Sequence, residues 1–241
     1  MNKQKMQFLK EELFGGWTAF EAFWVTSLIW LQIAVFARHP ESIPSIVAGI
    51  SGMFCVTFAA KGKISNYFFG IIQVSVYLYL SYQANLKGEQ MLNVFYLLAN
   101  FTGLYTWSKN MRQKEVHEGQ TLLVEGKSLN AKTWSFVAVG LLASWLLYAQ
   151  VLILLQSNQP YIDALSVAFS VLGQILMVLR FKEQWLMWII VNVLSIILWV
   201  RVVLHTGSQD YSVIAMWIGA LLNSIYGYIQ WKHLEQSPKK Y

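Results

Sequence analysis

Eight apolar runs dominate this chain, each long enough to cross a lipid bilayer as a helix. Spanning the hydrocarbon core takes about 20 mainly apolar residues, with a usual range of roughly 17–25. The runs lie at 18–37, 43–60, 64–84, 91–108, 134–156, 161–180, 184–204 and 211–231. Because lipid offers no partner for backbone polar groups, runs of this length are expected to be helical. The sequence therefore predicts an all-α polytopic membrane protein with eight transmembrane helices.

The composition agrees with this class and leaves no stretch for a soluble catalytic domain. The 241 residues are 56% hydrophobic and 12% charged, whereas soluble domains average about 25% charged residues. Walker A, Gly-x-Ser-x-Gly and dinucleotide-binding fingerprints do not occur in the sequence. The four histidines show no metal-ligand spacing. We expect a single membrane domain over 1–241 without enzymatic activity, catalytic residues, metal or cofactor.

Lysine and arginine are distributed unevenly between the two sides of the predicted membrane. Arg38, Lys87 and Arg201 fall on one side, and the other 15 of the 18 basic residues fall on the opposite side. Basic loop residues are retained in the cytoplasm, so both termini are expected to be cytoplasmic. This topology explains the net charge of +6 without a nucleic-acid partner.

The first fifteen residues alternate lysine and glutamate with apolar side chains. A secretory signal would instead show a continuous apolar core and a small-residue cleavage site. We expect an amphipathic helix on the cytoplasmic surface of the membrane. A disordered tail is the alternative.

Two parts of the chain resemble copies of one three-helix unit. Gln73 and Asn192 lie 119 residues apart, and after a small insertion Asn100 matches Asn223. Chance similarity between apolar helices is the alternative. The predicted organisation has an extra N-terminal helix, a first bundle, a cytoplasmic loop, a linker helix and a second bundle, at 18–37, 43–108, 109–133, 134–156 and 161–231. A single linker helix gives both bundles the same orientation, so the repeat is parallel.

Four amide side chains fall near the midpoints of four predicted spans. They are Gln73, Asn100, Asn192 and Asn223. A polar group facing lipid costs free energy, so amides at this depth face other helices or a cavity. They predict a polar, uncharged pocket at mid-membrane between the two halves, where a transporter would bind a small neutral or singly charged solute. Hydrogen bonding between helices is the alternative role for Asn100 and Asn223.

A stripe of aromatic and polar residues marks one face of the span 184–204. Trp185, Trp188 and Asn192 share this face with Ser195 and Trp199. Indole rings can stack on a flat ligand ring while an amide binds its edge, and a cationic ligand would add an attraction of roughly 0.5–2 kcal/mol. The alternative for Trp185 and Trp199 is the aromatic belt at the membrane interface. Gln174 on the preceding span and Tyr226 beside Asn223 complete the candidate substrate-binding residues.

Deep charged residues in a sustained arrangement are missing from the predicted spans. Proton- and sodium-coupled carriers usually keep at least one such residue within the membrane. The sequence therefore favours facilitated diffusion, although backbone carbonyls could bind sodium.

The chain resembles the PnuC family of bacterial vitamin transporters in two places. One is the run from Arg180 to Trp185 followed by Trp188 and Asn192, and the other is the stretch from Tyr226 to Trp231. The resemblance covers nearly all of the chain, and the predicted helix plan is distantly similar to that of the SWEET sugar transporters. It implies a homotrimer in the bacterial inner membrane that takes up nicotinamide riboside without ion coupling. It also implies trapping of the riboside through phosphorylation by a cytoplasmic kinase, in the service of NAD biosynthesis.

Three other functions remain open from the sequence. Relatives within the family carry thiamine or riboflavin, and one aromatic exchange could change the vitamin. A sugar carrier of the SWEET type is the next alternative. A membrane receptor that binds a ligand without translocating it is the alternative from another class. Besides the small-molecule substrate and membrane lipid, the partners expected are two further copies of the chain and the kinase.

Overall fold

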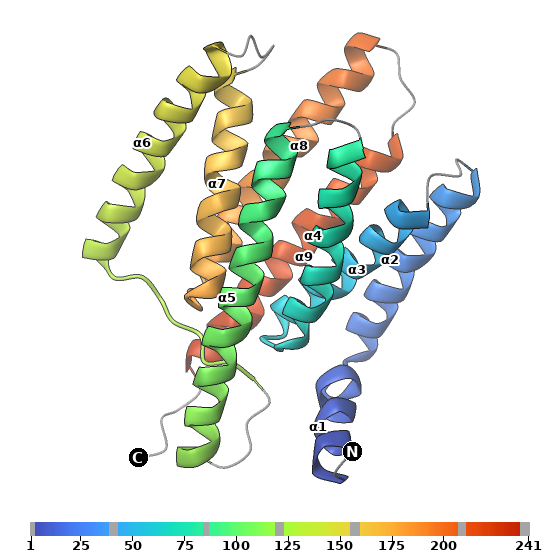
Figure 1. Ribbon diagram of the computed structural model, residues 1–241. Coiled ribbons are helices and arrows are strands. Elements are labelled where there is room, and N and C mark those ends of the chain that lie inside the picture. The colour runs from blue at the N-terminus through green and yellow to red at the C-terminus, as the bar shows by residue number, and fades with distance from the viewer. Residues whose placement is uncertain are drawn as a thin grey trace. The chain divides into compact units, whose positions relative to one another are not determined.

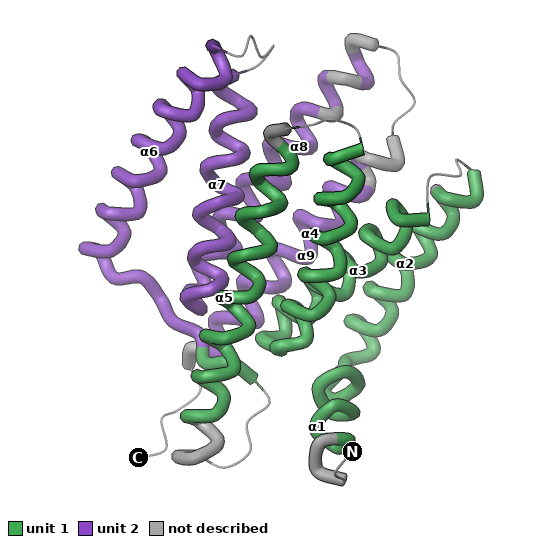
Figure 2. Tube along the Cα trace, viewed as in Figure 1, with its two compact units in different colours: residues 1–125, 236–241 green, residues 126–235 purple. Residues whose placement is uncertain are grey.

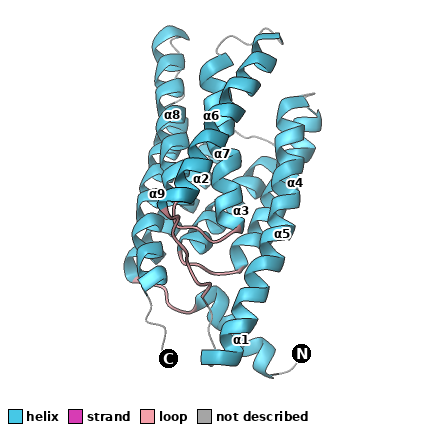
Figure 3. Cartoon of the chain, turned by 90° about the vertical axis from the view of Figure 1, so that its left-hand side faces the viewer, coloured by secondary structure: helices cyan, strands magenta, loops and turns pink. Residues whose placement is uncertain are grey.

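The computed structural model describes residues 3–38, 43–83, 87–118, 123–154, 160–206 and 211–236. Within these ranges the regular structure is helical (Figure 1; Figure 3). The helices are α1 (Lys3–Phe14), α2 (Ala19–Arg38), α3 (Ile43–Ala60), α4 (Ser65–Gln83), α5 (Lys87–Glu118), α6 (Ala131–Leu154), α7 (Pro160–Val178), α8 (Gln184–Thr206) and α9 (Tyr211–Gln236).

Helices α2 to α9 coincide with the eight predicted spans to within a few residues at most ends. By length and composition, four helices of the described part can cross a membrane: α2, α3, α6 and α7. One expectation was wrong at its boundary. The predicted loop 109–133 begins too early, because α5 continues to Glu118. The residues 109–118 are polar but contain neither glycine nor proline, so nothing in them ends a helix.

The chain divides into two compact units, residues 1–125 with 236–241 and residues 126–235 (Figure 2). In the first unit α3 packs against α2 and α4, and α4 packs against α5. In the second unit α7 packs against α6 and α8. Leu129, Leu176 and Met187 form a buried apolar cluster there, covered by Trp134 and Phe181 among others.

The same tight turn joins the first two helices of the repeat in each unit. After α3, the N–H of Lys63 donates to the carbonyl of Phe58, and Gly62 adopts a left-handed φ of 67°. After α7, the N–H of Phe181 donates to the carbonyl of Leu176 in the same six-residue pattern. This is a Schellman motif, which satisfies the last carbonyls of a helix.

The second copy of this turn places an arginine where the first has its glycine. Arg180 adopts a φ of 68° and lies 118 residues after Gly62. Left-handed backbone is costly for a side chain other than glycine, yet the turn is kept. The two units are therefore aligned at an offset of 118 at this point.

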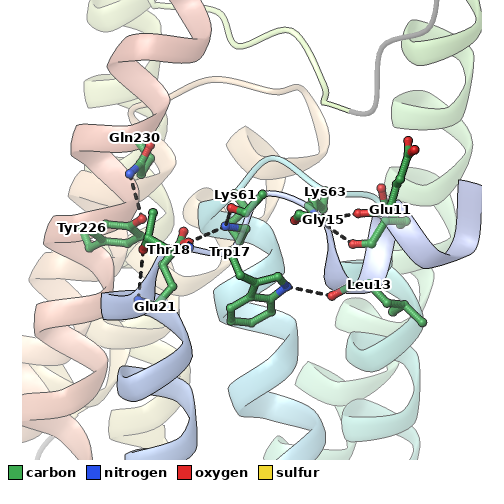
Figure 4. Close-up of polar contacts among 12 residues, drawn as sticks. Glu11, Leu13, Gly15, Trp17, Thr18, Glu21, Lys61, Lys63, Tyr226 and Gln230 are labelled. Carbon is green, nitrogen blue, oxygen red and sulfur yellow. Dashed lines mark hydrogen bonds and ion pairs between the residues drawn. The ribbon is translucent and has the colours of Figure 1, made fainter.

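Two lysines of the first turn hold the N-terminal segment within the first unit (Figure 4). Lys63 Nζ donates to the carbonyls of Glu11, Glu12 and Gly15 at 2.7–3.0 Å, which caps the end of α1. Lys61 Nζ lies 2.6 Å from Glu21 Oε2 and over the ring of Trp17. The predicted amphipathic segment is thus a helix with defined contacts.

Candidate functional site

In the first unit, each of two predicted amides lies against a glycine of the neighbouring helix. Gln73 on α4 is half-buried, and its amide packs over Gly52 of α3. Asn100 on α5 is 3% exposed and packs over Gly70 of α4, while its Nδ2 donates to the carbonyl of Tyr96 at 2.9 Å. Small residues let polar side chains approach the facing helix closely. The amides therefore lie within the helix bundle.

In the second unit, Asn192 links α8 to α9. Its Nδ2 donates to Ser224 Oγ at 2.9 Å, and Ser224 Oγ donates in turn to the carbonyl of Ala220 at 2.9 Å. Asn223, the neighbour of this serine, is also buried. Asn192 and Ser224 thus make an interhelical bond of the kind predicted as an alternative for Asn100 and Asn223, and Ser224 is a residue that the sequence reasoning missed.

The two tryptophans of α8 each pack on a glycine of a different neighbour. Trp185 is 3% exposed, and its six-membered ring lies against Gly227 of α9. Trp188 is half-buried, and its ring lies against Gly173 of α7. Within the second unit, α8 therefore extends one indole toward each flanking helix.

The two remaining candidates lie next to these glycines in the chain. Gln174 follows Gly173 on α7 and is buried. Tyr226 precedes Gly227 on α9, and its hydroxyl accepts a hydrogen bond from Gln230 Nε2 at 2.8 Å (Figure 4). Sequence periodicity singled out both candidates, but it gave no role to either glycine.

The structure corrects the register that relates the two units. The turns give an offset of 118 on the middle helices, one less than the spacing of Gln73 and Asn192. Trp107 and Trp231, both fully buried, give an offset of 124 on the last helices. Asn100 is then equivalent to Ser224. One residue rotates a helix position by about 100°, so the amides do not hold strictly equivalent positions and the two units offer different chemistry.

The first unit contributes amides and the second contributes indole faces, amides and a hydroxyl group, and none of the candidate side chains carries a formal charge. Indoles attract flat rings and cations, and amides both donate and accept hydrogen bonds. Groups of this kind suit reversible recognition of a polar aromatic molecule. They supply no nucleophile paired with a base, as covalent catalysis would need.

Comparison with known proteins places the chain among transporters. A family model described as "Nicotinamide mononucleotide transporter" matches residues 42–233. The nicotinamide riboside transporter PnuC of Neisseria mucosa is 41% identical over 226 residues, covering 93% of this chain and 85% of the relative. The protein of the same name from Haemophilus influenzae is 37% identical, covering 94% and 95%.

A solved structure agrees with these relatives. A crystal structure described as the vitamin B3 transporter PnuC matches with a TM-score of 0.80 and 40% sequence identity, covering 96% of this chain and 98% of the other. The match extends over the whole helical fold, so the similarity is one of architecture as well as of sequence. This chain therefore belongs to the PnuC family of multi-pass membrane transporters.

Proposed function

We propose that this protein takes up nicotinamide riboside across the bacterial inner membrane by facilitated diffusion. The observation that carries the proposal is the pair of indoles on α8, Trp185 and Trp188, which lie on one helix with the buried amide of Asn192. The relatives at 41% and 37% identity are named for the same riboside, which supports this choice of substrate.

The chemistry of the riboside matches that of the candidate residues. Nicotinamide riboside has a cationic aromatic ring, a carboxamide and ribose hydroxyls. The pyridinium ring would stack on Trp185 or Trp188, where a cation over an indole gains roughly 0.5–2 kcal/mol. The amides of Gln73, Asn100 and Asn192 would bind the carboxamide and hydroxyls, together with Asn223, Gln174 and Tyr226.

Uncharged binding groups also fit uptake without ion coupling. The candidate residues carry no carboxylate that could take up a proton or sodium ion with the substrate. Net uptake then requires removal of free riboside inside the cell. Phosphorylation by a cytoplasmic kinase would do this, because a phosphate group adds negative charge that membranes and neutral sites reject.

Three structural expectations belong to this proposal. The protein would function as a homotrimer with one substrate path in each copy. Its transmembrane helices would follow a plan of three, one and three, preceded by α2. Both termini would be cytoplasmic.

The first test is titration calorimetry on the purified protein with nicotinamide riboside, thiamine and riboflavin. Micromolar or tighter binding of the riboside alone supports the proposal. Heat only with thiamine or riboflavin would move the specificity to that vitamin. No heat of binding with any of the three compounds would contradict the substrate class and favour a sugar carrier.

Counterflow of labelled riboside in proteoliposomes then separates a carrier from a receptor. A carrier exchanges labelled riboside against an internal pool, whereas a receptor gives no exchange. Imposed proton and sodium gradients should leave the initial rate unchanged, and a dependence on either gradient would contradict facilitated diffusion.

A further inference from the structure

We propose that Gly173 and Gly227 are positioning residues for the substrate, because each supplies the space in which an indole ring of α8 lies. This inference rests on the proposed function, in which Trp185 and Trp188 contact the ligand. Neither glycine would touch the ligand in this role. Each would act through the ring that packs against it, and so set the affinity for an aromatic substrate.

The contact at Gly227 leaves no space for a side chain. A Cβ atom added there would lie 2.6–2.7 Å from three atoms of the Trp185 ring, namely Cε2, Cδ2 and Cζ2. Real Cβ atoms essentially never come this close to another heavy atom. The ring is rigid and 3% exposed, so it cannot rotate away as the tip of a flexible chain would. A methyl group at 227 must therefore displace either the indole or α9.

The contact at Gly173 is tight but less severe. An added Cβ would lie 3.2 Å from Trp188 Cε2 and 3.2 Å from the Cβ of Met187. A shift of a few tenths of an ångström would relieve this contact. Alanine at 173 should thus move the Trp188 ring slightly while the protein stays folded.

Backbone conformation does not explain either glycine. Both lie inside helices, and the described glycines with positive φ are Gly16 and Gly62. Glycine within a helix lowers stability relative to alanine, because it loses more conformational freedom on folding. At these two positions glycine instead leaves space for the side chain of the facing helix.

Comparison with the first unit shows that the packing of two indole rings on two glycines is found in the second unit. The ring of Tyr67, equivalent to Trp185 by the turns, packs on Gly103 in the same way. The pair equivalent to Trp188 and Gly173 is inverted, because Gly70 faces Cys55 there. Only the second unit, among the described residues, thus places two indoles of one helix on two glycines.

The test compares four single variants in thermal unfolding and in riboside binding by titration calorimetry. Gly227→Ala and Gly173→Ala should weaken binding by roughly 3- to 30-fold, the range expected when a ring–cation contact is disturbed. Gly103→Ala is the control with an even closer contact, to the ring of Tyr67, which is not among the proposed binding residues, so it should lower Tm and leave Kd unchanged. Gly140→Ala, where an added Cβ meets no atom within 4 Å, should leave Kd unchanged and raise Tm slightly, because alanine is favoured over glycine inside helix α6.

A double variant separates ring displacement from general damage. Phenylalanine is smaller than tryptophan, so Trp185→Phe should relieve the clash created by Gly227→Ala. The loss of affinity in the double variant should then be smaller than the two single losses combined. Additive losses would contradict positioning through the ring. If Gly227→Ala does not fold, Gly173→Ala carries the test.

A readout independent of the substrate keeps the proposal distinct from the proposed function. In protein labelled with 5-fluorotryptophan, the fluorine resonance removed by Trp185→Phe should shift in Gly227→Ala and stay in place in Gly140→Ala. If the wild type binds thiamine or riboflavin instead, the same variants are titrated with that vitamin. An unmoved resonance, or a moved resonance with wild-type Kd for the vitamin bound, would overturn the proposal.

Discussion

At the scale of single residues, Trp188 is the most direct test of how the substrate is held. Replacing it by alanine should weaken riboside binding by about 0.5–2 kcal/mol, because a cation–π contact is lost. Trp30→Ala is the matched control, since Trp30 is 64% exposed and lies on α2. Titration calorimetry on folded protein gives the answer. Unchanged affinity in Trp188→Ala would show that the pyridinium ring does not stack on this indole.

Gln184 offers a prediction about stability. It is fully buried, and neither amide atom has a hydrogen-bond partner among the described residues. The equivalent Asn66 is equally buried, but its Nδ2 donates to the carbonyl of Lys63 at 2.6 Å. An unsatisfied buried polar group costs roughly 1–3 kcal/mol. Gln184→Met, which keeps the length of the side chain, should therefore raise Tm by a few degrees.

Asn66→Leu is the control for this prediction. It removes an amide that makes a local bond, so it should lower Tm. A lower Tm in Gln184→Met as well would show that the Gln184 amide has a partner in the folded protein, such as a buried water molecule.

The sequence predicted which polar and aromatic residues lie on the same helix face, but it could not predict which residues of the facing helix they contact. Helical periodicity placed Trp188 and Asn192 on one face of α8, whereas in the structure Trp188 packs on α7 and Asn192 donates a hydrogen bond to α9. Periodicity says nothing about the facing helix, so Ser224 and Gly227 could not be found. It also carries no information on helix rotation, which explains why the predicted offset of 119 differs by one residue from that of the turns.

At the scale of elements, helix existence could be predicted better than helix ends. Apolar length predicted α2 to α9, because a membrane span needs a minimum number of apolar residues. The end of α5 could not be found in this way, since its last turns carry charges. Hydropathy reports where lipid would begin, whereas helix termination depends on local breakers and caps.

The attachment of α1 gives a prediction at this scale. Lys63 makes three hydrogen bonds to the end of α1, and Glu12 Oε1 accepts bonds from the backbone N–H and the hydroxyl of Ser65. Burial lowers the pKa of Lys63, while the Glu12 carboxylate acts in the opposite direction. Lys63→Met keeps the apolar stem but removes all three donors. It should detach α1 and speed tryptic cleavage after Lys10.

Lys109→Met is the control, because Lys109 is an exposed lysine on α5. Cleavage after Lys10 should proceed at the wild-type rate in this variant. Equal rates in Lys63→Met and wild type would show that other contacts hold α1. Riboside affinity, measured on the same samples, reports whether this helix affects substrate binding.

At the scale of the whole molecule, the protein class follows from features that extend along the entire chain, whereas the family resemblance begins from short local runs. Apolar length, the uneven distribution of basic residues and a Trp-x-x-Trp run each survive small errors in register. The number of membrane crossings is harder to predict, because a single missed span reverses the predicted side of the membrane for every later loop. Composition and length qualify α2, α3, α6 and α7 as spans, and α5 must also cross if the predicted topology holds.

Two single cysteines test that crossing in intact bacterial cells expressing the chain. Cys55 is the only cysteine, so Cys55→Ala provides the background. Gln83 is exposed at the end of α4 and Ser128 is exposed before α6, with α5 between them. If basic residues mark the cytoplasmic side, a membrane-impermeant maleimide should label Gln83→Cys in intact cells and Ser128→Cys only after permeabilisation. The reverse pattern would invert the orientation, and equal labelling of both would show that α5 does not cross.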